Sequence, residues 1–201
     1  LNEVNHRVKN NLATIIGLLY TERNRAELKD NPAFQDVIHN LSNRVRGLAT
    51  VHTMLSASGW QPLQLGKLVE QVARAALRAT PPGKYAAVTV SPVKIAIPPG
   101  QANNLAIVIN ELATNSVKHT CEEQNIIQIT VNLQQTGDLV ELEFRDDGPG
   151  YPDRVLRSNY KNVGLYLIQN IVEEGLNGTL ALSNDGGAVT NITFKLDAPE
   201  E

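Results

Sequence analysis

Apolar residues in the first 57 positions recur at helical spacing. Between residues 34 and 55 the spacings alternate between four and three residues, which is the heptad repeat of a helix that packs along one seam. The members of this heptad seam are Phe34, Ile38, Leu41, Val45, Leu48, His52 and Leu55. A looser stripe precedes the seam, at Val4, Val8, Leu12, Ile15 and Leu19. The pattern therefore predicts two helices over residues 1–57.

A short polar segment separates these two helices. Asp30, Asn31 and Pro32 favour a turn there, because proline suits the first position of a helix. Two helices with seam-type faces form an antiparallel hairpin. One hairpin alone buries too little apolar surface, so we expect two copies of the chain to pair into a four-helix bundle. The prediction is a homodimer.

Ser58 and Gly59 interrupt the helical pattern and predict a domain boundary, with one domain over 1–59 and a second over 60–201. The second domain mixes the two periodicities. The predicted helices are 63–79, 101–119 and 164–175, and the predicted strands are 86–97 (broken at Pro92), 126–133, 139–145, 179–183 and 188–196. Clustered strands with interspersed helices predict an α/β sandwich. The fold class is therefore α+β, with a helical hairpin followed by a sandwich.

Composition narrows the partners and the cellular compartment that we expect for the protein. The formal net charge of −3 over 201 residues provides no basic surface of the kind that nucleic-acid binding needs. Cys121 is the single cysteine, which excludes an intramolecular disulfide and predicts a reducing, cytoplasmic compartment. No stretch approaches the roughly 20 apolar residues that cross a bilayer. Because the chain begins at Leu1, without an initiating methionine, we expect a fragment whose parent is membrane-bound only if the preceding region supplies a span.

Four segments carry candidate chemistry, and their order along the chain is informative. They are residues 3–12 (Glu-Val-Asn-His-Arg-Val-Lys-Asn-Asn-Leu), 109–119 (Ile-Asn-Glu-Leu-Ala-Thr-Asn-Ser-Val-Lys-His), 146–150 (Asp-Asp-Gly-Pro-Gly) and 163–168 (Val-Gly-Leu-Tyr-Leu-Ile). Gly186, Gly187 and Thr193 echo the last segment near the end of the chain. A short glycine pattern alone is weak, whereas the four segments together are specific.

In this order the segments resemble those of two-component sensor histidine kinases, in particular the subfamily with a His-Arg-Val-Lys-Asn-Asn-Leu phosphoacceptor box, sister to the HWE kinases. The resemblance extends from Glu3 to about Phe194. It implies a sandwich of the GHKL (Bergerat) type, ATP and Mg²⁺ as cofactors, and a response regulator receiver domain as partner. It also implies site residues: His6 as phosphoacceptor, Asn115 as Mg²⁺ ligand, Glu111 as support for the metal and its water, and Lys118, His119, Asp146, Gly148, Gly150, Gly164, Leu165 and Thr193 around the nucleotide.

The residues support these roles on physical grounds. His6 lies two positions from both Val4 and Val8, about 200° round a helix from each, so it should point away from the apolar stripe toward solvent. An imidazole with an ordinary pKa of about 6.5 is mostly neutral at pH 7, and its free lone pair can attack a phosphoryl group. The alternative is a surface histidine with no role, which Lys9 and Asn10 in register with the box disfavour.

Glu111 and Asn115 stand four positions apart on a predicted helix, so they share one face. A carboxylate and a carboxamide there can hold Mg²⁺ against triphosphate oxygens. Lys118 and His119, one turn further, can meet phosphate charge. The alternative is an ordinary solvated helix face.

Asp146 ends a predicted strand, where its carboxylate can accept the exocyclic amine of adenine. Gly148 and Gly150 would let the backbone approach the base. Residues 151–162 are predicted to form a short mobile lid, and Gly164 opens a helix whose free N–H groups can receive phosphates. The alternative is an ordinary glycine-rich turn.

Three positions depart from the family pattern. Arg7 stands where many histidine kinases place an acid as proton acceptor; Glu3, one turn before His6, is a substitute, and the acceptor is left open. Asn110 replaces the histidine of the HWE kinases, which favours the sister subfamily. The segment before Leu165 has one glycine fewer than the fuller Gly-x-Gly form.

The sequence thus predicts an ATP-dependent kinase that autophosphorylates His6 and passes the phosphoryl group to an aspartate of a response regulator. One alternative is a serine kinase of the anti-sigma-factor type, against which the histidine-bearing hairpin argues. Another is a non-catalytic dimeric phosphotransfer scaffold with a decayed nucleotide site. Glu111, Asn115 and Asp146 argue against the scaffold, and the shortened glycine segment argues slightly for it.

Overall fold

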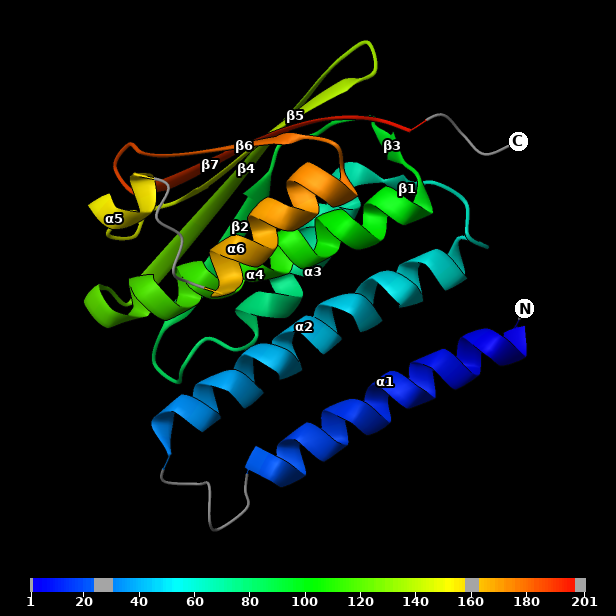
Figure 1. Ribbon diagram of the computed structural model, residues 1–201, viewed down its shortest axis with the longest axis horizontal. Coiled ribbons are helices and arrows are strands. Elements are labelled where there is room, and N and C mark those ends of the chain that lie inside the picture. The colour runs from blue at the N-terminus through cyan, green and yellow to red at the C-terminus, as the bar shows by residue number, and fades with distance from the viewer. Residues whose placement is uncertain (1, 24–30, 158–162, 198–201) are drawn as a thin grey trace.

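Three layers stack in the molecule, as Figure 1 shows: a helical hairpin, a layer of helices and a β-sheet. This computed structural model describes residues 2–23, 31–157 and 163–197. The elements, in chain order, are α1 (Asn2–Arg23), α2 (Pro32–Ala57), β1 (Leu63–Gln64), α3 (Leu65–Leu77), β2 (Tyr85–Val90), β3 (Ala96–Ile97), α4 (Pro99–Glu123), β4 (Ile126–Thr136), β5 (Leu139–Asp146), α5 (Asp153–Leu156), α6 (Val163–Asn170), its π-helical continuation η1 (Ile171–Gly175), β6 (Thr179–Asn184) and β7 (Ala188–Lys195).

The two predicted N-terminal helices are confirmed, and they lie side by side as a hairpin (Figure 1). Asn31 caps α2, because its side-chain oxygen accepts a hydrogen bond from the N–H of Phe34 at 3.2 Å. Pro32 occupies the first helical position, as expected. At the same end, Nε2 of Gln35 donates to the carbonyl of Arg23 at 2.8 Å, which places the end of α1 beside the start of α2.

The sheet has five strands in the order β2-β4-β5-β7-β6. The two predicted hairpins, β4–β5 and β6–β7, are both present and antiparallel. The first turns at Gly137, whose φ of +65° suits glycine. β2 pairs with β4 in parallel, which makes the sheet mixed. Helices with a mixed sheet confirm the predicted α+β class, a helical hairpin followed by an α/β sandwich.

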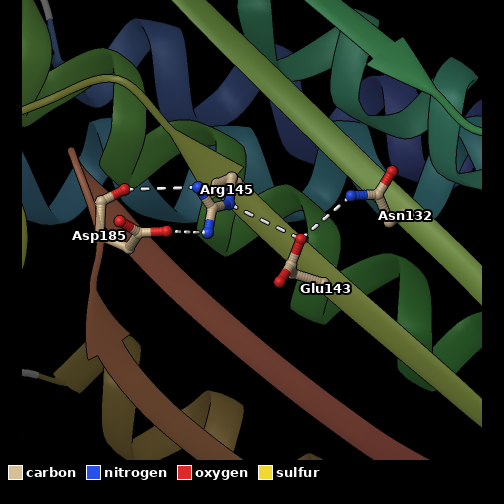
Figure 2. Close-up of polar contacts among 4 residues, drawn as sticks. All are labelled: Asn132, Glu143, Arg145 and Asp185. Atoms are coloured by element: carbon tan, nitrogen blue, oxygen red, sulfur yellow. Dashed lines mark hydrogen bonds and ion pairs between the residues drawn. The ribbon is translucent and has the colours of Figure 1, made fainter.

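The two faces of the sheet differ in polarity. Alternate residues of β4, β5 and β7 are buried under α3, α4 and α6, and they form most of the core. The outer face is polar, and Figure 2 shows part of it. Arg145 donates from Nη2 to Oδ2 of Asp185 at 2.6 Å, and its Nε lies 3.6 Å from Oε1 of Glu143, which also accepts from Asn132 at 3.0 Å.

The heptad seam on α2 is an incomplete description of that helix. Of its seven members only Ile38 and Leu55 are buried, and Leu41 keeps 40% of its surface exposed. α2 packs on α3 and α4 through a second stripe, whose buried members besides these two are Ser42, Asn43, Gly47 and Val51. The hydrophobic pattern missed this stripe because half of it is polar or glycine.

Two smaller expectations change. The helix predicted over 63–79 begins at Leu65, because Leu63 and Gln64 pair with Ile97 and Ala96 as a short antiparallel ladder. The helix predicted over 164–175 changes from α to π geometry after Asn170. None of the helices in the described ranges is long and apolar enough to cross a bilayer.

The segment after α2, where the sequence predicts a domain boundary, has an unusual backbone. Gly59 and Trp60 both have positive φ, at +66° and +64°. The indole of Trp60 meets the ring of His52 edge-on, with the centroids 5.5 Å apart and the planes at 81°. The chain contains one tryptophan, so this ring contact reports on the junction between hairpin and sandwich.

Candidate nucleotide-binding site

The carboxylate of Asp146, at the end of β5, is held from three sides. Its Oδ1 accepts from the backbone N–H groups of Gly148 at 3.0 Å and Ala188 at 3.3 Å. Its Oδ2 accepts from the hydroxyl of Ser116 on α4 at 2.5 Å. These partners come from the loop after β5, from β7 and from α4, so the sheet and the helical layer jointly fix one carboxylate. A group held this way is pre-organised to receive a donor.

Glycines bring the backbone close to Asp146. A Cβ on Gly187 would lie 1.9 Å from the carbonyl oxygen of Asp146, so no side chain fits there. A Cβ on Gly148 would lie 2.2 Å from Oγ1 of Thr120. Gly150 has a φ of +83°, and a Cβ there would lie 2.9 Å from the side chain of Asn184. The predicted importance of Gly148, Gly150 and Gly187 thus has a steric basis.

Hydroxyl groups that the sequence motifs did not emphasise line the same region. Thr120 on α4 is buried, and no described residue provides a hydrogen-bond partner for its Oγ1. Thr190 on β7 is fully buried, and its Oγ1 lies 2.6 Å from the hydroxyl of Tyr151. Ser116, Thr120 and Thr190 are thus buried polar residues at the edge of an otherwise apolar core.

Thr193 does not join this group. From Thr190 onward the buried residues of β7 alternate, so Thr190, Ile192 and Phe194 face the helices. Thr193 therefore lies on the outer face, where a shallow groove is lined by polar residues that include Asn191 and Glu143. The alternation in the sequence itself would have selected Thr190 instead.

The residues predicted to meet Mg²⁺ and the phosphates lie along α4. Asn115 is half-buried, and Lys118 and His119 are exposed one turn further. Glu111 is buried, and both of its oxygens accept from the guanidinium of Arg44 on α2, at 2.8 and 3.1 Å. Among the described residues, no group of three or more His, Cys, Asp or Glu side chains is placed to hold a metal ion.

The remaining predicted residues are placed as follows. Gly164 and Leu165 are buried in the first turn of α6. The predicted lid contains the short helix α5, and its residues 158–162 lie outside the described residues. The backbone of His6 lies in α1, but its side chain also lies outside the described part of the structure, so its predicted orientation stays a prediction.

Two family models match the chain in sequence order. A model described as "Histidine kinase" matches residues 3–80. A model described as "Histidine kinase-, DNA gyrase B-, and HSP90-like ATPase" matches residues 100–200, which is half of the chain. The chain belongs to the sensor histidine kinases. This confirms the resemblance that the four sequence segments indicated.

Curated proteins similar to this chain are also histidine kinases. The sensor histidine kinase PdtaS of Mycolicibacterium smegmatis is 25% identical over 98% of this chain and 39% of its own length. The blue-light-activated histidine kinase of Rhizobium johnstonii is 27% identical over 99% of this chain and 54% of its own length. The chain therefore spans about half or less of these curated relatives.

The solved histidine kinase domain of the blue-light-activated histidine kinase of Erythrobacter litoralis superposes with a TM-score of 0.69. It is 24% identical and covers 97% of this chain and 92% of that domain. At this identity the likeness establishes the shared fold, including both the hairpin and the sandwich.

Proposed function

We propose that this histidine kinase core autophosphorylates His6 from Mg²⁺–ATP and passes the phosphoryl group to an aspartate of a response regulator. The observation that carries the proposal is the Asp146 carboxylate, held by Ser116, Gly148 and Ala188 beside a hydroxyl that has no partner among the described residues. The order of the two matched family models supports it.

The polar groups around Asp146 support the binding of a nucleobase there. Oδ1 already accepts two N–H groups, whereas Oδ2 accepts only the Ser116 hydroxyl, so a lone pair on Oδ2 can accept the exocyclic amine of adenine. Oγ1 of Thr120 is buried without a partner in the described structure, which is unfavourable unless a ligand or water satisfies it. The absence of a Cβ at Gly148 leaves room beside that hydroxyl. We assign Thr190 to this end of the site in place of Thr193.

The triphosphate would extend from this pocket along α4 toward the N-terminus of α6. The amide oxygen of Asn115 and the carboxylate of Glu111 are the candidate donors to Mg²⁺, and Lys118 and His119 are placed to meet phosphate charge. Magnesium usually keeps several waters and takes substrate oxygens, so two protein donors suffice. When bound, the metal supplies charge neutralisation.

In the proposed reaction a ring nitrogen of His6 attacks the γ-phosphorus. The new N–P bond forms as the bond from that phosphorus to the β–γ bridging oxygen breaks, and ADP leaves. The attack leaves a cationic phosphorylated imidazole, whose proton on the other ring nitrogen passes to an acceptor that we leave open between Glu3 and solvent. In the second step an aspartate of the regulator takes the phosphoryl group and restores the imidazole.

Exposed apolar residues on the hairpin support the proposed homodimer. Leu18 on α1 keeps 61% of its surface exposed and Val37 on α2 keeps 55%, and Ile15 and Leu41 are also exposed. Because α1 and α2 are antiparallel, these residues gather near the turn end of the hairpin. A second hairpin would cover them. Sedimentation equilibrium should give a dimer for the parent and a monomer for the variant that combines Leu18→Glu with Leu41→Glu.

The reaction is tested with γ-labelled ATP and Mg²⁺, comparing the parent with His6→Ala and Asn115→Ala. Acid-labile label is expected on the parent and on a His52→Ala control, and on neither site variant. Acid-stable label would indicate the serine kinase alternative. ATP binding without any label would favour the phosphotransfer scaffold.

A further inference from the structure

An ion pair joins the hairpin to the sandwich at a residue of the proposed active site. Nε of Arg44 on α2 donates to Oε1 of Glu111 on α4 at 2.8 Å, and Nη2 donates to Oε2 at 3.1 Å. The two side chains are only 23% and 9% exposed. This two-bond fork engages both oxygens of the carboxylate and fixes its orientation.

The contact around the pair is close but incompletely satisfied. Gly47, one turn beyond Arg44, faces Asn110, and a Cβ there would lie 3.0–3.1 Å from the Asn110 side chain. The glycine therefore lets α2 approach α4. Nδ2 of Asn110 is buried, and no described residue accepts a hydrogen bond from it. A buried ion pair adds little net stability after desolvation, and an unpaired amide subtracts from it. Such a contact is suited to opening.

The docked position is displaced from His6 along the hairpin. Gln35 contacts Arg23 at the turn end, which sets a common origin for α1 and α2. At about 1.5 Å per helical residue, Arg44 lies about 14 Å from that end and His6 about 25 Å. Arg44, and with it Glu111, therefore lies about 12 Å closer to the turn end than His6, measured along the hairpin. In a two-fold bundle whose axis follows the hairpin, the partner subunit's equivalent histidine lies at the same level.

We propose that Arg44 is a positioning residue that holds Glu111 in a docked, non-transferring arrangement, and that the pair must open before His6 is phosphorylated. The proposal rests on the proposed kinase function. A carboxylate that accepts two guanidinium bonds has its charge neutralised and both oxygens directed at Arg44. Turning either oxygen toward a metal-bound water at Asn115 would break a bond of this fork. The hydrogen bonds that hold Asp146 come from Ser116, Gly148 and Ala188 and not from α2, so we expect nucleotide binding without opening.

Opening is measured first, by a signal that needs no kinase activity. Trp60, the single tryptophan, packs on His52 of α2 at the junction. Arg44→Met and Glu111→Gln should each change the emission of Trp60 in the same direction. Arg74→Met is the matched control, because it removes a comparable arginine–glutamate contact, to Glu70, that lies within α3 on the surface. Parent-like emission from both pair variants would overturn the proposal, whether or not the protein is a kinase.

Kinetics then separate positioning from folding. Arg44→Met should raise the rate of His6 labelling roughly three- to thirtyfold, which lies within the range of typical pair couplings, with the KM for ATP unchanged. Arg44→Lys keeps the positive charge but loses the two-bond fork, so its labelling rate should lie between those of the parent and Arg44→Met. An equal or lower rate for a folded Arg44→Met protein, with Arg74→Met like the parent, would contradict the proposal.

A reversible cross-link tests the docked arrangement directly. Gly47→Cys with Asn110→Cys, in a Cys121→Ser background, places two Cβ atoms close enough for a disulfide after a small adjustment. The oxidised protein should bind ADP normally and lose His6 labelling, and reduction should restore it. Labelling of the oxidised protein at the reduced rate would overturn the proposal. If the protein binds ADP but His6 is labelled in neither the oxidised nor the reduced form, the result counts against the kinase function. The emission of Trp60 would then still test whether the Arg44–Glu111 pair holds the two elements together.

Discussion

The base end and the metal end of the proposed site are built differently. Asp146 receives its three hydrogen bonds from α4, β7 and its own loop, all within the sandwich. Glu111, on the same helix as Ser116, is held by Arg44 from the hairpin. One end is complete whatever the hairpin does, whereas the other depends on where the hairpin lies.

In the proposed mechanism, this difference separates nucleotide binding from phosphoryl transfer. A carboxylate fixed by backbone N–H groups can select a base in every state of the protein, because its partners move with the sheet. A carboxylate fixed by an arginine of another element changes its partner when the two elements separate. Under the proposal, the nucleotide stays bound at Asp146 while the position of the hairpin controls phosphoryl transfer.

The largest expected effect comes from Asp146→Asn. Because it replaces the charged acceptor, nucleotide affinity should fall about 100-fold, the scale of a lost charged hydrogen bond. Titration calorimetry with ADP measures it. Asp185→Asn, on the exposed outer face, is the matched control and should bind like the parent. If Asp146→Asn kept its affinity, the base end would have to be placed elsewhere.

Gly187→Ala sharpens the comparison through sterics. Its Cβ would meet the Asp146 carbonyl, so the free energy of unfolding should fall by about 3 kcal/mol and nucleotide affinity should fall with it. Gly186→Ala is the neighbouring control: its Cβ meets open space and only the φ of +65° is strained, at about 1 kcal/mol. Urea denaturation distinguishes the two. Equal losses of unfolding free energy in the two variants would show that Gly187 is needed only for the backbone conformation of the turn.

Ser116→Ala should have a moderate effect. It removes one donor to Asp146, and nucleotide affinity should fall about fivefold, equivalent to roughly 1 kcal/mol. Thr193→Val tests the correction on β7 at the same time, because a residue on the outer face should leave affinity unchanged. A loss in Thr193→Val equal to that in Ser116→Ala would reject the assignment of Thr190 to the pocket.

The smallest effect is expected on the outer face, at Arg145 (Figure 2). Its hydrogen bond to Asp185 raises the pKa of Arg145 above its ordinary value. A raised pKa contributes stability below the unfolded value that is lost only as pH rises through the folded value, so this contribution is constant across neutral pH. Arg145→Gln should leave nucleotide affinity and its dependence on pH between 6 and about 9 unchanged. A change in affinity would connect the outer face to the site.

Much of the sandwich was predictable because its information is local. Alternating residues place both hairpins, turn residues end them, and the helix over 101–119 is present within α4. The close contact between Asp146 and Gly148 was predictable for the same reason, since a strand end followed by glycines brings backbone and carboxylate together within a few residues. Alternation along β7 also contained the choice of Thr190 over Thr193.

The sequence by itself determined the order of the four segments, the hairpin, the sandwich and the face that Glu111 shares with Asn115. Only the tertiary structure decided that Arg44, 67 positions away, would hold Glu111, and that Thr120 would lie over Gly148. Periodicity follows from backbone geometry within one element. Which helix faces meet depends on side chains from distant elements, and the α2 stripe that meets α4 is too polar to be recognised by hydrophobicity.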